Sequence, residues 1–421
     1  MSYSPRRILL CAYACRPNAG SEPMVGWSAY QALRKQHAVR VLCSDSGAAA
    51  IAEAVTAGEA DAEDFCWIPE RFRGTGRPAV DKLLSWLNTF HFQRTLLEQG
   101  RREIQAFRPD VIHQVTIATW RVENPLAGRG IPFVWGPVGG GEELPLTFLR
   151  TFSAFSASFE VARMISGLMA RHHPAVKQTA RQADWIFAGN RPTADLLARL
   201  RGSSAGVEIL PQVFFAEKKM QEFQPRVEKK EVPPASVQIF SGGYVEARKG
   251  MSLALQALAR LKQRGYSFHY EHGGIGPERT HLIRQIEKMG LTKEAKIVQP
   301  YSGEAYQQKL RTTDVFLFPS LRESCGISLL EAMGHGCVPV VADHAGPGEI
   351  VTPECGVKIP VTRPKEFVAR LSDELASLFQ DAEKRRRLGA AARSRVLKKF
   401  SQSHWLERVE NAYHLTTPRA G

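Results

Sequence analysis

The chain has 421 residues, of which 43% are hydrophobic and 23% charged, with 56 Lys and Arg against 42 Asp and Glu. This length exceeds one ordinary hydrophobic core and predicts two or three soluble globular domains. A net charge of +14 is compatible with nucleic acid, anionic lipid or phosphorylated substrates as partners. We expect no nucleic-acid partner, because the sequence has no zinc finger, aromatic RNA-binding signature or arginine-rich tail.

The cysteines and the first residues indicate a cellular compartment. Seven cysteines lie scattered through apolar segments, a pattern typical of buried free thiols in a reducing cytoplasm. The first apolar run ends at Pro17–Gly20 and is too short for a signal peptide or a membrane span, which needs roughly 18 apolar residues. We expect a cytoplasmic protein, with peripheral contact to the inner face of the membrane as a further hypothesis.

The first loop has the composition of a phosphate-binding loop. A buried strand is predicted at 8–14 and a helix at 24–36, and the loop between them contains Gly20. Strand, glycine-bearing loop and helix form the common cradle for a phosphate group. The glycines lack the G-x-G-x-x-G spacing, so dinucleotide binding is unsupported.

Further strands alternate with helices through the first half of the chain. A strand at 131–135 is followed by three glycines, Gly139–Gly141, which let the backbone approach a ligand closely. A mobile surface loop is the alternative. The other predicted elements are strands at 39–43, 65–68 and 110–113, a strand that enters a short helix at 183–190, a helix at 48–63, and one or two amphipathic helices within 78–107. Residues 207–211 close this half of the chain.

Residues 145–181 combine phenylalanines with basic side chains. An apolar face with basic flanks is how an interfacial helix docks on anionic lipid. An ordinary helix that packs with its charges solvated has the same composition, so both readings stay open. The residues concerned are Phe148, Phe152, Phe155, Phe159, Arg150, Arg163, Arg171, Lys177, Arg181 and the pair His172–His173.

A second domain is predicted to begin after a charged, proline-containing segment at 216–236, which reads as an exposed linker. A strand at 237–241 leads into the loop 242–250 and then the helix 251–261. This is again a strand, glycine loop and helix, and it now contains two cations, Arg248 and Lys249. We expect the loop to bind phosphate.

The stretch from 315 to 342 predicts one right-handed crossover with a ligand site at its turn. Strands are expected at 315–318 and 337–342, with a helix at 326–333 between them. Ligands of open parallel sheets bind at such turns, and the start of the helix offers free N–H groups. Glu323 and Glu331 would differ by about 12 Å in helical rise, which suits two ends of one elongated ligand.

These motifs carry a resemblance to a known family. Glu323, seven residues, Glu331, Ala332–Met333 and the turn Gly336–Val340 resemble the retaining nucleotide-sugar glycosyltransferases of family 4, which have the GT-B fold. Residues 273–278 and 346–351 resemble turns of that family near the nucleotide and the diphosphate, and Gly20–Trp27 resembles a bacterial branch of it.

The resemblance implies site roles. Glu323 would orient the donor sugar, Glu331 would bind the ribose, and Lys249 would bind the diphosphate. The family's Arg after the first glycine of that loop is unmatched, since Gly243 or Tyr244 stands there, and Arg248 is the candidate substitute. Further donor-binding candidates are Gly20, Gly276, Cys325, Gly326 and Ile327.

The family's His-x-His at the end of one amino-terminal strand is matched only in part. His113 is present, but the second histidine is missing. His113 is the catalytic candidate, with Thr116 and Arg121 as neighbouring alternatives, and a hydrogen-bonded structural histidine is an equal reading. Glu142 would lie near the acceptor.

The implied architecture is α/β, with two Rossmann-like domains facing each other across a cleft. We expect an amino-terminal acceptor domain at 1–215, a linker at 216–236, a donor-nucleotide domain at 237–398, and a terminal helix at 399–421 that crosses back to the first domain.

The implied activity is transfer of a sugar from a nucleoside diphosphate sugar to a hydroxyl of a saccharide or lipid-linked acceptor, with retention of configuration. No cofactor and no obligate metal are expected. Envelope polysaccharide or lipopolysaccharide assembly is the expected pathway. The alternatives are a catalytically silent nucleotide-binding subunit, or a GT-B epimerase or sugar-phosphate synthase.

Overall fold

The computed structural model describes residues 4–20, 22–72, 74–76, 78–225 and 236–416. Their contacts divide the chain into two units. The first unit comprises Met1–Gly141, Ile165–Ala216 and Gln402–Gly421, and the second comprises Glu142–Met164 and Glu217–Ser401. Among the described residues, no helix has both the length and the apolar character that crossing a membrane requires.

The first unit is built on a parallel sheet in the order β3-β2-β1-β4-β5-β6-β7. Its central strands are buried on both faces: Ile8 and Leu10 of β1 point into one core cluster, and Leu9 and Cys11 into the other. Strands covered on both sides read as continuous apolar runs. Their bounds are β1 (Arg7–Cys11), β2 (Ala38–Ser44), β3 (Phe65–Ile68), β4 (Val111–Gln114), β5 (Phe133–Val138), β6 (Trp185–Ala188) and β7 (Val207–Ile209).

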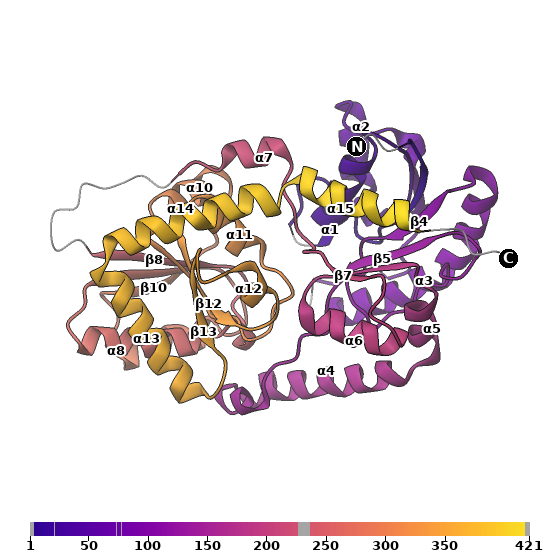
Figure 1. The fold of residues 1–421 in the computed structure, drawn as a ribbon. Coiled ribbons are helices and arrows are strands. Elements are labelled where there is room, and N and C mark those ends of the chain that lie inside the picture. The colour runs from indigo at the N-terminus through magenta and orange to yellow at the C-terminus, as the bar shows by residue number, and fades with distance from the viewer. Residues whose placement is uncertain (1–3, 21, 73, 77, 226–235, 417–421) are drawn as a thin grey trace. The chain divides into compact units, whose positions relative to one another are not determined.

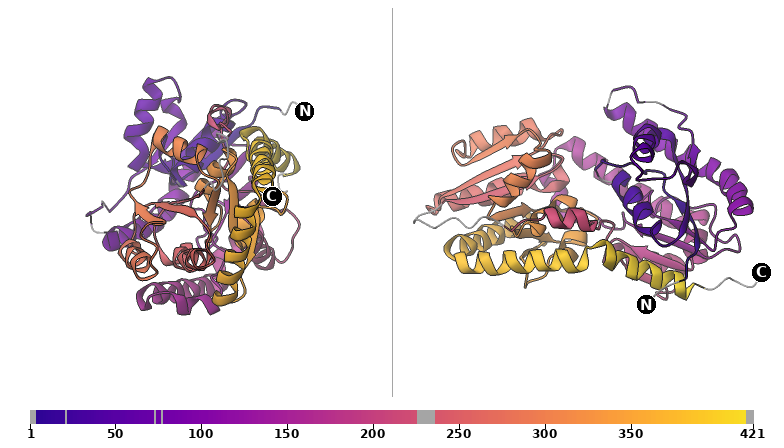
Figure 2. Two further views of the ribbon diagram at one scale, coloured as in Figure 1. Left: turned by 90° about the vertical axis from the view of Figure 1, so that its left-hand side faces the viewer. Right: turned by 90° about the horizontal axis from the view of Figure 1, so that it is seen from above.

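Helices cover both faces of this sheet (Figures 1 and 2). One of them is α15 (Gln402–Leu415), from the end of the chain, whose Trp405, Val409 and Tyr413 are buried in the same cluster as Ile8 and Leu10. The other helices are α1 (Glu22–Leu33), η1 (Asp45–Gly47), α2 (Ala48–Thr56), η2 (Ala62–Asp64), α3 (Pro78–Phe107), α5 (Pro174–Gln182) and α6 (Arg191–Arg201).

One helix of the first unit is shorter than the sequence suggests. A helix was expected over 48–63, but α2 ends at Thr56. Gly58 lies in the left-handed region with φ 73°, a conformation that ends a helix. Of the one or two amphipathic helices expected within 78–107, the structure has one, α3.

The second unit has a parallel sheet in the order β10-β9-β8-β11-β12-β13. The central strand β11 reads Val-Phe-Leu-Phe, and all four side chains are buried. Val315 and Leu317 face the cluster formed with α8 and α13, and alternation directs Phe316 and Phe318 to the other face. The strands are β8 (Val237–Gly242), β9 (Phe268–Gly273), β10 (Ala295–Val298), β11 (Val315–Phe318), β12 (Val338–Asp343) and β13 (Val357–Pro360).

The helices of this unit also lie on both faces of its sheet (Figure 1). They are η3 (Leu146–Thr151), α7 (Glu217–Glu222), η4 (Ala247–Lys249), α8 (Met251–Gln263), α9 (Arg279–Lys288), α10 (Gly303–Arg311), α11 (Ile327–Gly334), α12 (Ala345–Ile350), α13 (Pro364–Gln380) and α14 (Ala382–Lys399). The helix α4 (Ala154–His172) begins in the second unit and ends in the first.

Two segments have an organisation that the sequence patterns did not indicate. Residues 142–164 group with the second unit. Within the expected linker, α7 is helical and the Phe223 side chain is 1% exposed, with its ring 5.5 Å from that of His335. The rest of that linker, 226–235, lies outside the described residues. The seven cysteines are free and all but Cys66 are buried, which confirms the expectation of buried thiols.

Candidate functional site

The sheet of the second unit brings two expected site loops to one edge. The strands β8 and β11 are neighbours and parallel, so the loop after β8 and the turn after β11 lie at the same carboxyl-terminal edge. There the Lys249 ammonium forms an ion pair with the Glu323 carboxylate. The Arg248 guanidinium lies 3.3 Å from the same carboxylate oxygen and donates to the Arg322 carbonyl at 2.7 Å.

The two cations determine the ionisation state of Glu323. Burial by itself raises the pKa of the Glu323 carboxyl, but Lys249 and Arg248 outweigh it and hold the pKa below its ordinary value. The Lys249 ammonium also lies 5.3 Å from the centre of the Phe318 ring. The three charged side chains are 16 to 19% exposed, so they are sheltered yet reachable. Glu323 is therefore an anion held by two cations at the edge of the sheet.

The helix α11 starts beside this group. Its N-cap is Gly326, with φ 118°, a conformation that favours glycine, and an added Cβ there would lie 3.1 Å from the Phe318 ring. Gly346 fixes the turn from the other side, since its N–H donates to the Glu323 carbonyl at 3.1 Å and an added Cβ would lie 2.1 Å from the Ser324 carbonyl oxygen. The N–H groups at Ile327 and beyond thus begin a helix whose positive end faces this edge.

Glu331 lies one helical turn further along α11. Burial raises the pKa of its carboxyl to about 7, with nearby Lys219 lowering it and Glu222 raising it. In the described part of the chain, no cation lies within ion-pair distance of this carboxylate. Glu323 and Glu331 are thus opposite in character, one paired and ionised and the other sheltered and easily protonated.

A hollow of about 330 Å³ lies at the ends of β8, β9 and β10 and is lined in part by the loop after β8 and by α11. Its walls are aromatic and apolar, from Phe240, Ile275, Tyr301 and Tyr306, with Ser328 of α11 at one side and glycine backbone at another. A flat apolar ring fits between such walls.

Glycines bring the loop 273–278 against the loop 242–250. An added Cβ at Gly276 would lie 2.2 Å from the Val245 carbonyl oxygen, and one at Gly274 would lie 2.0 Å from that of Gly243. The expected donor residue Gly276 therefore acts through packing: it lets the two loops meet. Cys325 is 5% exposed, so its thiol is buried at the turn.

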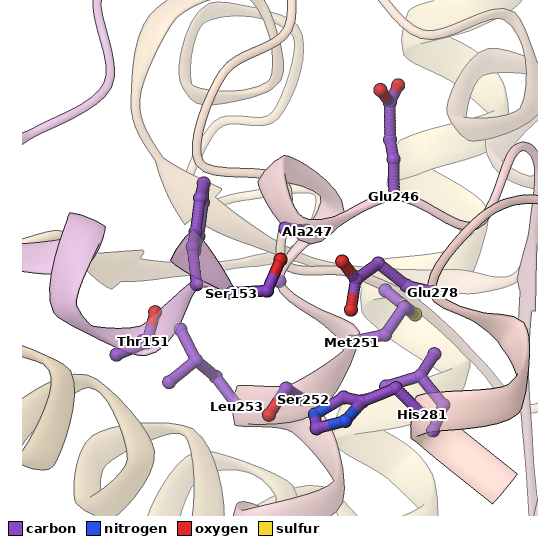
Figure 3. A pocket seen from close by; sticks show the side chains of 12 residues that line it. Thr151, Ser153, Glu246, Ala247, Met251, Ser252, Leu253, Glu278 and His281 are labelled. Carbon is purple, nitrogen blue, oxygen red and sulfur yellow. The ribbon is translucent and has the colours of Figure 1, made fainter. Parts of the chain in front are cut away.

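A second, smaller hollow of about 180 Å³ lies on another side of the loop 242–250. Figure 3 shows the Glu278 carboxylate turned toward Ser153, whereas the Glu246 side chain points the other way. The Glu246 carboxylate instead pairs with Arg248. The hollow thus borders the charged group without including Lys249 or Glu323.

The remaining expected residues lie in the first unit. His113 is 0% exposed, and its two ring nitrogens lie 2.7 Å from the Tyr413 hydroxyl and 2.7 Å from the Gly136 carbonyl. Burial lowers its pKa to about 4. In this conformation both ring nitrogens are hydrogen-bonded within the protein, so neither is available to a sugar. This arrangement is the one expected of a structural histidine. Gly20 is exposed, and an added Cβ there would meet no atom within 4 Å.

The neighbourhood of β4 contains two features that the sequence did not single out. Ile117 has φ 58°, a strained conformation for a β-branched residue. The Glu22 carboxylate accepts from the N–H of Ala118 at 2.7 Å, and burial raises its pKa. Thr116 is also engaged, because its hydroxyl oxygen accepts from the Ala14 N–H at 3.1 Å. Glu22 lies within the Gly20–Trp27 motif, so the sequence resemblance marks its segment. The resemblance does not predict its hydrogen bond to Ala118.

Part of the chain that contains this site matches a known protein family. Residues 223–395 match the family model "Glycosyl transferases group 1". These residues include Lys249, Glu323 and Glu331. No group of three His, Cys, Asp or Glu side chains that could hold a metal occurs in the described ranges.

Among similar sequences, WcaL of Escherichia coli, assigned as a colanic acid biosynthesis glycosyltransferase, is 30% identical over 181 residues, which are 39% of this chain and 44% of that protein. The amylovoran biosynthesis glycosyltransferase AmsK of Erwinia amylovora is 31% identical over 121 residues, 27% of this chain and 30% of that protein. The chain spans about half or less of the length of the curated relatives it matches.

Solved structures resemble nearly the whole chain. Sucrose-phosphate synthase from Thermosynechococcus elongatus has a TM-score of 0.64 at 15% identity, covering 97% of this chain and 98% of that one. Anabaena Alr3699/HepE in complex with UDP-glucose has a TM-score of 0.60 at 14% identity, covering 98% and 100%. The chain therefore has the GT-B fold of two Rossmann-like domains, and its residues 223–395 match the model of the glycosyl transferases group 1 family.

Proposed function

We propose that the protein is a retaining glycosyltransferase of family 4 that moves a sugar from a nucleoside diphosphate sugar to a hydroxyl of a saccharide or lipid-linked acceptor. The observation that supports this most is the group of Lys249, Arg248 and Glu323 beside the start of α11. Two cations and free helix N–H groups attract a diphosphate, and a carboxylate between them accepts hydrogen bonds from sugar hydroxyls.

The donor would lie along the sheet edge. The hollow of about 330 Å³ lined by Phe240, Tyr301 and Tyr306 has room for a nucleobase between aromatic walls, and Glu331 would accept from the ribose hydroxyls. The diphosphate would reach Lys249 and the helix start, which leaves the sugar beside Glu323. In this proposal Arg248 substitutes for the family's unmatched arginine, because its guanidinium already lies at Glu323.

The chemistry needs stabilisation of a leaving diphosphate. The bond from the anomeric carbon to the phosphate oxygen breaks, and a bond to the acceptor oxygen forms on the same face. The acceptor proton passes to the departing phosphate, as the family resemblance implies. Lys249, Arg248 and the N–H groups of α11 would stabilise the negative charge that develops on that phosphate. The account requires no metal.

Peripheral membrane contact and envelope polysaccharide assembly extend the proposal. On α4, Phe155 is 79% exposed and Phe159 is 42% exposed, and Leu146 of η3 is 63% exposed. Residues 145–181 contain five Arg and Lys and one carboxylate. Apolar side chains within a basic segment bind anionic lipid, and a lipid-linked acceptor would be met there. Relatives assigned to colanic acid and amylovoran biosynthesis point the same way.

A thermal-shift screen tests the proposal. A ligand that binds only the native state stabilises the protein and so raises its melting temperature. At a ligand concentration of a hundred times Kd, the free energy of unfolding increases by about 2.7 kcal/mol. UDP-, GDP-, ADP- and dTDP-sugars are compared on the wild-type protein and on Lys249→Ala. We expect one nucleotide class to raise the melting temperature of the wild-type protein, with a smaller rise in the variant. No rise with any of the four classes would contradict the proposal.

A further inference from the structure

A buried ion pair lies one residue away from Glu323. Within the second unit, Glu160 of α4 and Arg322 form two parallel hydrogen bonds, Nε to Oε2 at 3.0 Å and Nη2 to Oε1 at 2.8 Å. Their side chains are 5% and 14% exposed. Paired bonds of this kind fix the position of both planar groups and not only their separation.

The pair belongs to a network that surrounds the Glu323 turn. The Arg322 carbonyl accepts from Arg248, which also approaches the Glu323 carboxylate. On the other side of Glu323, the Ser324 hydroxyl donates to the Glu142 carboxylate at 2.7 Å. Both neighbours of Glu323 in the chain are therefore held by side chains from residues 142–160.

Arg163 closes the network from within α4. It donates to the Glu142 carbonyl, and its Nε lies 3.7 Å from Glu160 Oε2. Because Glu160 lies between two arginines, removing its charge leaves Arg322 with one carboxylate partner fewer in a sheltered place. A sheltered charge that loses its partner moves toward water or toward another anion. The carboxylates at this turn are Glu323 itself and Glu142, which the Ser324 hydroxyl contacts.

We propose that Glu160 is a positioning residue for Glu323: through Arg322 it keeps the turn, and with it the donor-sugar carboxylate, at a fixed place against α4. The inference rests on the proposed function and names a residue outside the matched family region, 223–395. Glu160 touches neither donor nor acceptor in this account. It acts on where Glu323 stands relative to Lys249.

The alternative is that the pair only stabilises the unit. The two accounts differ in which constant changes. A positioning role lowers kcat while nucleotide affinity stays, because the hollow beside Tyr301 and the N–H groups of α11 do not involve Glu160. A purely structural role loosens the unit as a whole and shifts the melting temperature and nucleotide affinity together.

The test uses the purified full chain with Glu160→Gln, an isosteric change. The measurements are the kcat of sugar-nucleotide hydrolysis or transfer, the Kd of the nucleoside diphosphate selected by the thermal-shift screen, and the melting temperature. A small misplacement of a reacting group costs up to about a hundredfold in rate, and we expect kcat to fall by about tenfold to a hundredfold. Nucleotide Kd should stay within about twofold of the wild-type value.

A second variant protects against a folding artefact. In Glu160→Gln with Arg322→Gln the two amides can bond to each other, and neither charge is left over. Residues that act as one unit are non-additive: because the double variant leaves no unpaired Arg322 charge to disturb the turn, its kcat should be higher than that of Glu160→Gln, and a kcat equal to or below that of Glu160→Gln would contradict the positioning role. The matched control is Glu103→Gln, which removes a carboxylate 17% exposed from its pair with Arg40 in the first unit and should keep wild-type kcat.

The outcomes separate this inference from the proposed function. A wild-type protein without sugar-nucleotide turnover defeats both. Turnover that is equal in the wild-type protein and Glu160→Gln defeats the positioning role alone. A parallel loss of kcat, nucleotide affinity and melting temperature in Glu160→Gln also defeats it, because that pattern belongs to the structural alternative.

Discussion

Lys249 and Glu323 form an ion pair across 74 positions of sequence, at the edge where the strands β8 and β11 end side by side. Among the described residues, the ion pairs of Glu323 join it to Lys249 and Arg248 of the other loop, and they form because the sheet aligns the two strands. In the proposed function, a diphosphate that binds at this edge competes with the Glu323 carboxylate for the Lys249 ammonium.

Removing the ammonium should slow turnover strongly. Lys249→Ala takes one positioned charge from the place where the leaving phosphate becomes negative. Loss of a single such group costs about 10²–10³ in kcat. The fall in kcat is measured as steady-state turnover of the sugar nucleotide by Lys249→Ala and by the wild-type protein. Lys262→Ala is the control, because that ammonium pairs with Glu294 at 40% exposure, and equal activity of the two variants would contradict the assignment of Lys249.

Glu331 predicts a pH dependence of stability in the ligand-free protein. Burial raises the pKa of its carboxyl from 4.5 to about 7, so the native state binds this proton more tightly than the unfolded chain does. The resulting stabilisation is complete below pH 4.5 and is lost as the pH rises through 7. Glu331→Gln cannot titrate, so the wild-type protein should lose melting temperature relative to this variant between those two pH values.

The check is the difference in melting temperature between the wild-type protein and Glu331→Gln, measured across that interval without nucleotide. A difference that stays constant with pH would show that the carboxyl is not sheltered. With nucleotide present, the ionised carboxylate accepts from ribose hydroxyls more strongly than the protonated carboxyl does, so donor affinity should rise as the pH increases through about 7.

His113 should matter for stability and not for turnover. His113→Ala leaves the Tyr413 hydroxyl and the Gly136 carbonyl without their present partner, and a buried polar group without a partner costs about 1–3 kcal/mol. We expect a lower melting temperature with kcat of the folded protein near the wild-type value. Tyr413→Phe removes one of the same bonds and should show the same sign. A large fall in kcat at unchanged melting temperature would instead support the catalytic candidate.

The exposed side of α4 should govern lipid binding. Phe155→Ser with Phe159→Ser removes two of its apolar side chains, which are 79% and 42% exposed. Co-sedimentation with vesicles of phosphatidylcholine and phosphatidylglycerol should fall, and salt should weaken wild-type binding. Leu415→Ser is the control, because Leu415 is 53% exposed on another helix. If the variant with Phe155→Ser and Phe159→Ser binds vesicles as well as the wild-type protein does, α4 is not the lipid contact.

Much of the fold could be predicted because it depends on local pattern. The run Val315–Phe318 is apolar at every position, as a central parallel strand must be, and Phe65–Ile68 was predicted with the bounds that β3 has. Strands that alternate with helices place each following turn at one edge of a sheet. Lys249 and Glu323 could therefore be assigned to one edge before any contact between them was known.

The rest depends on contacts that no local pattern encodes. Glu160 and Arg322 lie 162 positions apart, and neither stands out among the other charged residues of its segment. The same holds for residues 142–164, whose membership of the second unit follows from packing, and for Phe223, whose apolar side chain lies in a segment dominated by charge. His113 looked available because a strand end is normally open, but Tyr413 arrives from 300 positions away.

The most direct test of the central claim is sugar-nucleotide turnover by Glu323→Gln at equal concentration of folded protein, alongside nucleotide binding. The account predicts turnover lower by about 10²–10³ while the nucleoside diphosphate still raises the melting temperature, because Glu323 acts on the sugar and Glu331 on the ribose. Turnover by Glu323→Gln equal to that of the wild-type protein would contradict it.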